Sequence, residues 1–192
     1  MDGNDDMLQE ASARLTYEDL LQFSDDGLRH ELIDGVHFVT ASPVTRHQRI
    51  LRRLTVSIEN WLTGHPVGEI FFGPIDVVLS SVDVVVPDLI YVSWEKSQSL
   101  KDDGMFAAPD FVVEILSPST RRRDEELKRR LYERTGVKEY WLIDPERDVT
   151  AIYRRDGASF VHVEALLSLA DDELTTPLFP GFSLRLRALL AR

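Results

Sequence analysis

The sequence predicts a mixed α/β (α+β) fold in which a central β-sheet is flanked by helices. Apolar residues at helical spacing predict a long helix over residues 46–62 and another helix after residue 120. Near-continuous apolar runs over residues 82–92 and 111–116 predict strands that are buried on both faces. The predicted order along the chain is helix, hairpin, helix, strands, helix, strand and hairpin, which gives a mixed sheet covered by helices.

Length and composition limit the class of protein. The 192 residues are 43% hydrophobic, which predicts one globular domain over residues 15–192 and a polar, flexible N-terminus over residues 1–14. Cysteine is absent, so the chain has neither disulfides nor a thiolate metal site, which suits the reducing cytoplasm. No apolar run approaches the length of a membrane span, and we expect no membrane partner.

The first third of the chain predicts a short helix, a hairpin and a long helix. Residues 15–21 open the short helix, with Thr16 as its cap and Asp19 three residues later. Residues 30–39 predict a hairpin that turns at Asp34-Gly35, and position alone favours a solvent-facing Glu31. The buried stripe of the long helix consists of Ile50, Leu51, Leu54, Ile58, Trp61 and Leu62.

The remaining elements follow from shorter patterns. Residues 69–79 predict one strand, and residues 94–108 a polar loop that is long enough to act as a flap. Gly136 predicts a helix end, and residues 139–145 predict a further strand. Residues 150–163 predict a hairpin, and residues 180–186 a closing strand or bend.

Two carboxylates stand within the predicted buried strands. Asp88 follows Pro87, which cannot donate to a sheet ladder, and Glu114 lies in the middle of its apolar run. An ionised carboxylate in an apolar core costs several kcal/mol unless a cation pairs with it. If both strands belong to one sheet, the two acids come close on one face.

The helix after residue 120 directs a lysine toward the same place. Leu127 and Leu131 mark its inward stripe, and Asp124 and Lys128 fall on or beside that stripe. Two carboxylates near one another form an oxygen site of the kind that Mg²⁺ or Mn²⁺ prefers. The residues leave a second interpretation equally open, in which Lys128 only neutralises Glu114 and Asp88 as an ion pair.

Several motifs in this order resemble those of the Uma-two family, restriction-endonuclease-like bacterial proteins of the PD-(D/E)xK nuclease superfamily. The resemblance spans about residues 15 to 187. The matching segments are His30-Glu31-Leu32-Ile33-Asp34-Gly35, Val86-Pro87-Asp88-Leu89, Val113-Glu114-Ile115-Leu116-Ser117-Pro118-Ser119-Thr120 with Asp124 and Lys128, Gly136-Val137-Lys138-Glu139-Tyr140-Trp141-Leu142-Ile143-Asp144-Pro145 and Pro180-Gly181-Phe182.

The resemblance implies a restriction-endonuclease-like αβββαβ core, a metal site and a homodimer. It implies that Asp88, Glu114 and the main-chain carbonyl of Ile115 hold Mg²⁺ or Mn²⁺, with Glu31 as a further catalytic member. Where the superfamily pattern has a lysine two residues after the acid, this chain has Leu116, which cannot polarise water. The resemblance implies that Lys128 on the following helix replaces that lysine.

The net charge of −11 argues against a whole-surface nucleic-acid binder but permits a local basic rim. Residues 117–134 carry seven positive and four negative side chains, a local charge of +3. This segment and the start of the long helix supply the candidate phosphate contacts, which are Arg121, Arg122, Arg46 and Arg49.

The sequence therefore predicts a Mg²⁺- or Mn²⁺-dependent nuclease that hydrolyses phosphodiesters, with DNA as the expected substrate. In this prediction Asp88 and Glu114 hold the metal, Lys128 positions or activates water, and Glu31 supports them. One alternative is a non-catalytic interaction module in which the same residues form a buried ion network. Another is a metal-dependent hydrolase of a small phosphorylated molecule, which would lack the basic rim.

Overall fold

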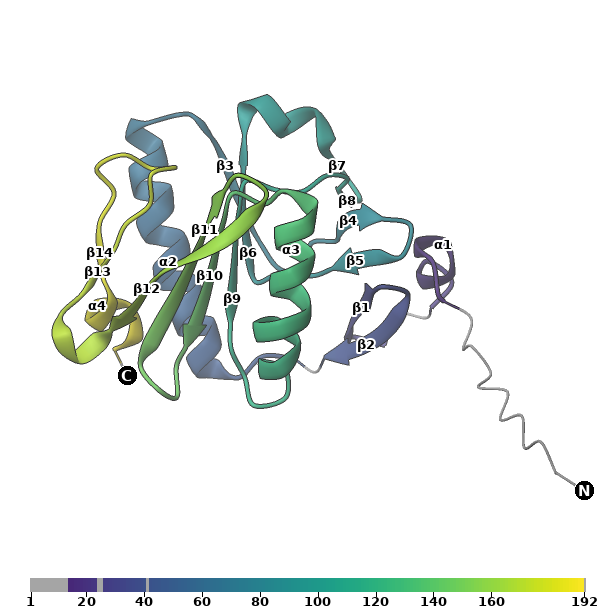
Figure 1. The fold of residues 1–192 in the computed structure, drawn as a ribbon, viewed down its shortest axis with the longest axis horizontal. Helices are drawn as coiled ribbons and strands as arrows, with labels where there is room; N and C mark the ends of the chain where they lie inside the picture. The colour runs from purple at the N-terminus through teal and green to yellow at the C-terminus, as the bar shows by residue number, and fades with distance from the viewer. Residues whose placement is uncertain (1–13, 24–25, 41, 192) are drawn as a thin grey trace, which may run out of the picture.

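The computed structural model describes residues 14–23, 26–40 and 42–191, apart from the side chains of residues 163 and 164. The flexible terminus predicted for residues 1–14 lies, except for Arg14, outside the described residues. Within the described residues, two six-stranded sheets and a two-stranded sheet are combined with helices, so the predicted mixed α+β class is confirmed (Figure 1).

The six-stranded sheet that contains β9 and β10 lies at the centre of the molecule (Figure 1). Its two middle strands, β9 and β10, run parallel to each other, and the other neighbouring pairs run antiparallel, so the sheet is mixed. Every residue of β9 and β10 is buried, as expected for strands covered on both faces. In spatial order the strands are β12 (Ser159–Leu167), β11 (Val149–Asp156), β10 (Glu139–Asp144), β9 (Phe111–Ile115), β6 (Leu89–Ser93) and β3 (Gly68–Phe72).

The second sheet lies at the side of the first and is built from short strands. Its predicted hairpin, with the turn at Asp34-Gly35, is confirmed. Its spatial order is β2 (Val36–Thr40), β1 (Arg29–Ile33), β5 (Asp83–Val85), β4 (Val77–Ser80), β8 (Gly104–Met105) and β7 (Leu100–Lys101). The two-stranded sheet pairs β13 (Glu173–Leu174) with β14 (Leu184–Arg185).

Two neighbouring crossings of the chain between the two large sheets position Asp88. The single strand predicted for residues 69–79 is wrong, because Gly73-Pro74 divides it into β3 of one sheet and β4 of the other. The irregularity predicted at Pro87 is confirmed, because β5 and β6 also belong to different sheets. The Gly73 N–H donates to the Asp88 carbonyl at 3.0 Å, which joins the two crossings. Asp88 therefore lies where the sheets part.

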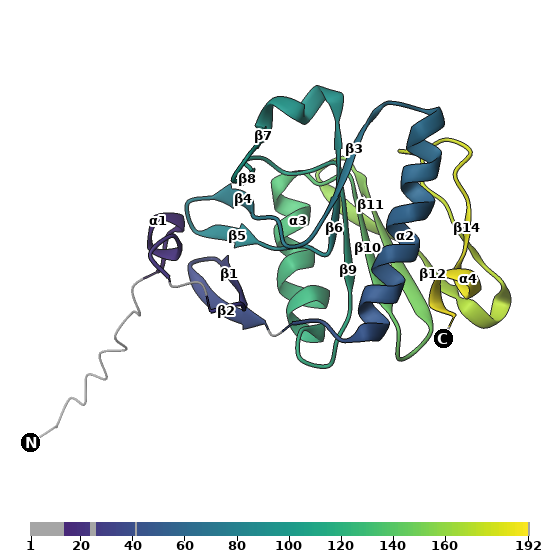
Figure 2. The same ribbon diagram turned by 180° about the vertical axis from the view of Figure 1, so that it is seen from behind.

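Helices cover both faces of the central sheet. The long helix α2 (Thr45–Gly64) packs on one face with α4 (Leu186–Leu190), around a core that includes Leu54, Ile58 and Trp141 (Figure 2). The other face carries α3 (Arg129–Thr135), preceded by a π-helical segment, η2 (Arg123–Lys128). Gly136 ends α3 in a left-handed conformation with φ 95°, which confirms the predicted helix end.

The remaining segments refine the predictions. The short helix α1 (Tyr17–Leu20) has the predicted capping box between Thr16 and Asp19. The loop expected over residues 94–108 instead contains a 3₁₀-helix, η1 (Trp94–Ser99), and two strands whose Met105 is fully buried. The chain ends with a 3₁₀-turn, η3 (Ser168–Ala170), and with α4, which the sequence pattern did not predict. None of the helices in the described residues has the length and apolar character needed to cross a bilayer.

Candidate active site

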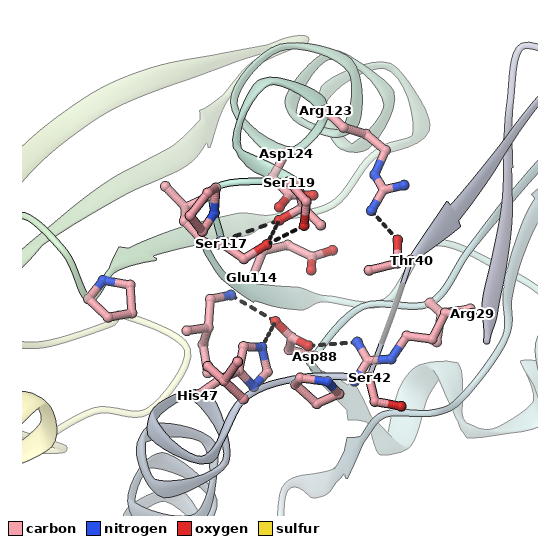
Figure 3. A pocket seen from close by; sticks show the side chains of 18 of the residues that line it. Arg29, Thr40, Ser42, His47, Asp88, Glu114, Ser117, Ser119, Arg123 and Asp124 are labelled. Carbon is pink, nitrogen blue, oxygen red and sulfur yellow. Dashed lines mark hydrogen bonds and ion pairs between the residues drawn. The ribbon is translucent and has the colours of Figure 1, made fainter. Parts of the chain in front are cut away.

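A cavity of about 500 Å³ opens where the two large sheets part (Figure 3). Five ionisable residues predicted from the sequence line it, although they come from both sheets and from η2: Glu31, Asp88, Glu114, Asp124 and Lys128. All five are buried, with at most 4% of each residue exposed. The fold therefore gathers at one cavity the acids and the lysine that stood out in the sequence.

Asp88 is held by three donors. Its Oδ1 accepts a hydrogen bond from Arg29 Nη1 at 2.9 Å, and its Oδ2 accepts one from the Ile115 N–H at 2.8 Å. His47 Nε2 lies 2.9 Å from the same Oδ2 (Figure 3). Leu89 lies opposite Val113 in the antiparallel pair of β6 and β9. Asp88 immediately precedes Leu89, so extending this register by one residue places Asp88 opposite Glu114. The predicted proximity of the two acids is thus built into the strand pairing.

Glu114 is bound on one side only. Its Oε1 accepts hydrogen bonds from Lys128 Nζ at 2.8 Å and from Tyr132 Oη at 3.0 Å. No hydrogen bond from another described residue reaches Oε2, and Glu114 lines the cavity. In Figure 3 the carboxylate points to the centre of the site. Glu114 Oε1 is thus hydrogen-bonded within the protein, and Oε2 is available to a ligand.

Glu31 faces inward, so the solvent-facing orientation expected from its position is wrong. Its Oε1 lies 2.7 Å from Lys128 Nζ and accepts the Val86 N–H at 2.8 Å, and its Oε2 lies 3.3 Å from Arg123 Nη2. Val86 stands at the bend between β5 and β6, where a ladder partner is missing. A buried N–H needs an acceptor, and Glu31 supplies it from the neighbouring sheet.

Burial and mutual repulsion set the charges of the site. Burial raises the pKa of Glu114 well above its ordinary value against the attraction of Lys128, and repulsion from Asp124, Asp88 and Glu31 acts in the same direction as burial. Burial also raises the pKa of Asp124. Burial would raise the pKa of Asp88 too, but the hydrogen bonds from His47, Ile115 and Arg29 hold it below its ordinary value. The surrounding carboxylates overcome burial to raise the pKa of Lys128, which therefore stays protonated.

The donor set fits a hard divalent cation, although no group of three side-chain ligands is preassembled among the described residues. Four buried acids, Glu31, Asp88, Glu114 and Asp124, contact three cations of the chain, Lys128, Arg29 and Arg123. Asp124 Oδ1 is buried without a hydrogen-bond partner within the described part of the chain. Carboxylate oxygens with unused lone pairs are what Mg²⁺ and Mn²⁺ bind.

The arginines predicted to contact nucleic acid differ in their surroundings. Arg121 binds Asp144 through two hydrogen bonds of 2.6 and 3.1 Å and also contacts Glu125 and Glu146. Arg122 is exposed, and Arg46 lines the cavity 3.1 Å from Asp148. Arg49 is exposed on α2 and lines a neighbouring groove. Arg121 is thus already neutralised by the chain, whereas the other three remain accessible.

Two residues of the site, Arg29 and His47, were missed by the sequence interpretation. Arg29 lies two residues before Glu31 on β1, so strand alternation places both side chains on one face. His47 lies three residues before Ile50 and seven before Leu54, which continues the buried stripe of α2 by one turn. Both signals were present in the sequence, but neither showed that Asp88 was the partner.

Comparison with known proteins supports the architecture. The family model Uma2, described as "Putative restriction endonuclease", matches residues 16–187. A crystal structure described as a "putative nuclease belonging to DUF820 from Anabaena variabilis" aligns with a TM-score of 0.78 and 20% identity, covering 92% of this chain and 98% of that chain.

Other comparisons add little. The type IIG restriction endonuclease BpuSI aligns with a TM-score of 0.38 and 11% identity over 64% of this chain and 13% of its own, too weakly to carry an argument. No curated protein matches the sequence. The family model spans almost all of the described residues and includes every acid of the site together with Lys128. The chain belongs to the Uma2 family.

Proposed function

We propose that the protein is a divalent-metal-dependent nuclease that hydrolyses phosphodiester bonds, with DNA as its substrate. One observation carries the proposal: Asp88, just before β6, and Glu114, near the end of the antiparallel neighbour β9, line one cavity, with the Lys128 amine 2.8 Å from Glu114. Membership in a family described as restriction endonucleases supports the same reaction class.

In this proposal Asp88, Glu114 and the carbonyl of Ile115 hold Mg²⁺ or Mn²⁺. The metal would neutralise charge on the scissile phosphate and lower the pKa of a bound water. Lys128, protonated between Glu31 and Glu114, orients Glu114 and donates hydrogen bonds toward negative charge that develops on the phosphate. Arg29 holds Asp88 from the opposite side, and Glu31 fixes Lys128 and the bend at Val86.

A second candidate is a non-catalytic interaction module that keeps the nuclease fold. The observation that favours it is the completeness of the ion network, because both oxygens of Asp88 already have partners within the protein. Buried acids that are paired in this way can serve specificity of folding instead of catalysis. Metal binding separates the two candidates.

Calorimetric titration with Mn²⁺ tests the proposal on wild type and on Glu114→Gln, followed by cleavage of a labelled DNA duplex. We expect wild type to bind Mn²⁺ and cleave, and Glu114→Gln to lose both, with thermal melting unchanged or raised. Glu126→Gln on the exposed side of η2 is the matched control and should retain both properties. Absence of Mn²⁺ binding by wild type, together with a lowered melting temperature of Glu114→Gln, would favour the interaction module.

A further inference from the structure

A groove of about 410 Å³ is lined by residues of α2 and by Phe72, the last residue of the edge strand β3. It starts beside the active-site cavity, because Thr45 lines the groove while Arg46 and His47 line the cavity. We call it the α2–β3 groove. Its walls are formed by Thr45, Gln48, Arg49, Leu51, Arg52, Thr55, Val56 and Phe72.

The charge of the α2–β3 groove is opposite to that of the protein. The chain carries a net charge of −11, yet none of the described residues that line the groove is acidic. Arg49 and Arg52 are both exposed and stand three residues apart on one helix face, where like charges repel. Neither guanidinium has an ion-pair or hydrogen-bond partner among the described residues, in contrast to Arg46, Arg53 and Arg121. Two adjacent unneutralised cations are suited to an anionic ligand.

The groove also offers an aromatic ring. Phe72 is 59% exposed at the end of β3, beside the bend that carries Asp88, and pairs with Leu89 in the sheet. An exposed ring beside cations is the arrangement with which proteins bind single-stranded nucleic acid, because unpaired bases stack on the ring while arginines contact phosphates. The stacked bases of a duplex are not available to such a ring, so the groove favours a single strand.

We propose that the α2–β3 groove binds a single-stranded segment of nucleic acid and leads it to the active-site cavity. This inference rests on the proposed nuclease function and narrows its substrate to DNA with a single-stranded end, flap or gap. Arg49 and Arg52 contact consecutive phosphates, Phe72 stacks on a base, and Thr45 and Gln48 offer neutral hydrogen-bonding groups toward the cavity.

The test measures binding without chemistry. Fluorescence anisotropy in the presence of a metal chelator follows binding of the full chain to a labelled oligothymidylate of about 12 nucleotides, and to a duplex of equal length. We expect Phe72→Ala to weaken oligonucleotide binding by roughly 5- to 150-fold without changing its salt dependence. We expect Arg49→Ala/Arg52→Ala to reduce the slope of log K against log salt by about 1.4, the value for two single-strand phosphate contacts.

Arg130→Ala is the matched control, because Arg130 is an exposed arginine of α3, which packs on the opposite face of the central sheet. It should bind the oligonucleotide as wild type does, and all variants should keep the wild-type melting temperature. Equal binding by wild type, Phe72→Ala and the double arginine variant would overturn the inference. Tighter binding to the duplex than to the single strand would also overturn it.

Size-exclusion chromatography with light scattering tests whether a second copy of the chain occupies the groove instead of nucleic acid. A dimer that becomes a monomer in Phe72→Ala would assign the groove and the edge of β3 to contact between two copies, and the inference would be wrong.

The experiments distinguish a failure of the groove inference from a failure of the nuclease proposal. Binding that depends on the groove without any metal-dependent cleavage counts against the nuclease proposal alone, whereas cleavage that is insensitive to the groove variants counts against the groove alone.

Discussion

At the scale of single residues, Lys128 holds the acids of the site together. Its side chain is 2% exposed, and its Nζ lies within 2.8 Å of both Glu31 and Glu114. Lys128→Met would leave these buried carboxylates without their shared cation, and we expect it to lower the free energy of unfolding by about 3–5 kcal/mol. Urea denaturation at neutral pH measures the change.

The control for this prediction is Arg130→Met, two residues further along the chain in α3, where the side chain is exposed. It should leave the free energy of unfolding unchanged. Because Lys128 and Glu114 interact directly, the effects of Lys128→Met and Glu114→Gln should not add, and the double variant should be more stable than their sum predicts. Strict additivity would contradict the ion network as the reason for the loss.

At the scale of elements, Asp110 joins three segments around the start of β9. Its Oδ2 accepts the Ser93 N–H at 2.9 Å, and its Oδ1 lies 2.8 Å from Lys138 Nζ and 3.4 Å from Lys96 Nζ. Burial would raise the pKa of Asp110, but the bonds from Lys138 and Ser93 and the charge of Lys96 lower it below its ordinary 3.8. The ionised carboxylate therefore stabilises the end of β6, the start of η1 and the approach to β10.

This arrangement predicts a pH-dependent effect of Asp110→Asn. A depressed pKa gives stability that is present above the unfolded-state pKa and is lost as the pH falls through the lower folded-state value. At pH 7 we expect Asp110→Asn to lower the free energy of unfolding by about 1.5–3 kcal/mol, and this deficit should shrink as the pH falls below about 4. Urea denaturation over a pH series tests it, with Asp102→Asn on an exposed turn as the control. A deficit that is constant with pH would rule out the ionised carboxylate as its cause.

At the scale of the whole molecule, the net charge of −11 should make stability and nucleic-acid binding respond to salt in opposite directions. Screening reduces the self-repulsion of an acidic protein, so the melting temperature should rise between about 50 and 200 mM salt. Over the same interval, binding of a single strand through two phosphate contacts should weaken roughly sevenfold. Thermal melts and anisotropy titrations in the same buffers test this pair of trends. A melting temperature that falls with salt would show that local ion pairs outweigh the net repulsion.

Much of the fold was readable from the sequence because its signals are local. Apolar spacing within a few residues defined α2, β9 and the inward stripe that carries Lys128. Glycine and aspartate marked the hairpin turn and the end of α3. For the same reason Asp88 and Glu114 stood out, since a carboxylate within a buried apolar run conflicts with its immediate neighbours.

The sequence by itself thus determined the α+β class, most elements and the identity of the acids and lysine of the site. Only the tertiary structure decided the partners of Asp88, because these lie far apart in the chain: Arg29 and His47 stand 59 and 41 residues from Asp88. It also decided that the strand over residues 69–79 breaks into two sheets and that Glu31 turns inward. The strand breaks at Gly73-Pro74, and Glu31 turns inward because the Val86 N–H at the bend before Asp88 and the buried Lys128 require an acceptor that no neighbouring residue in the sequence supplies.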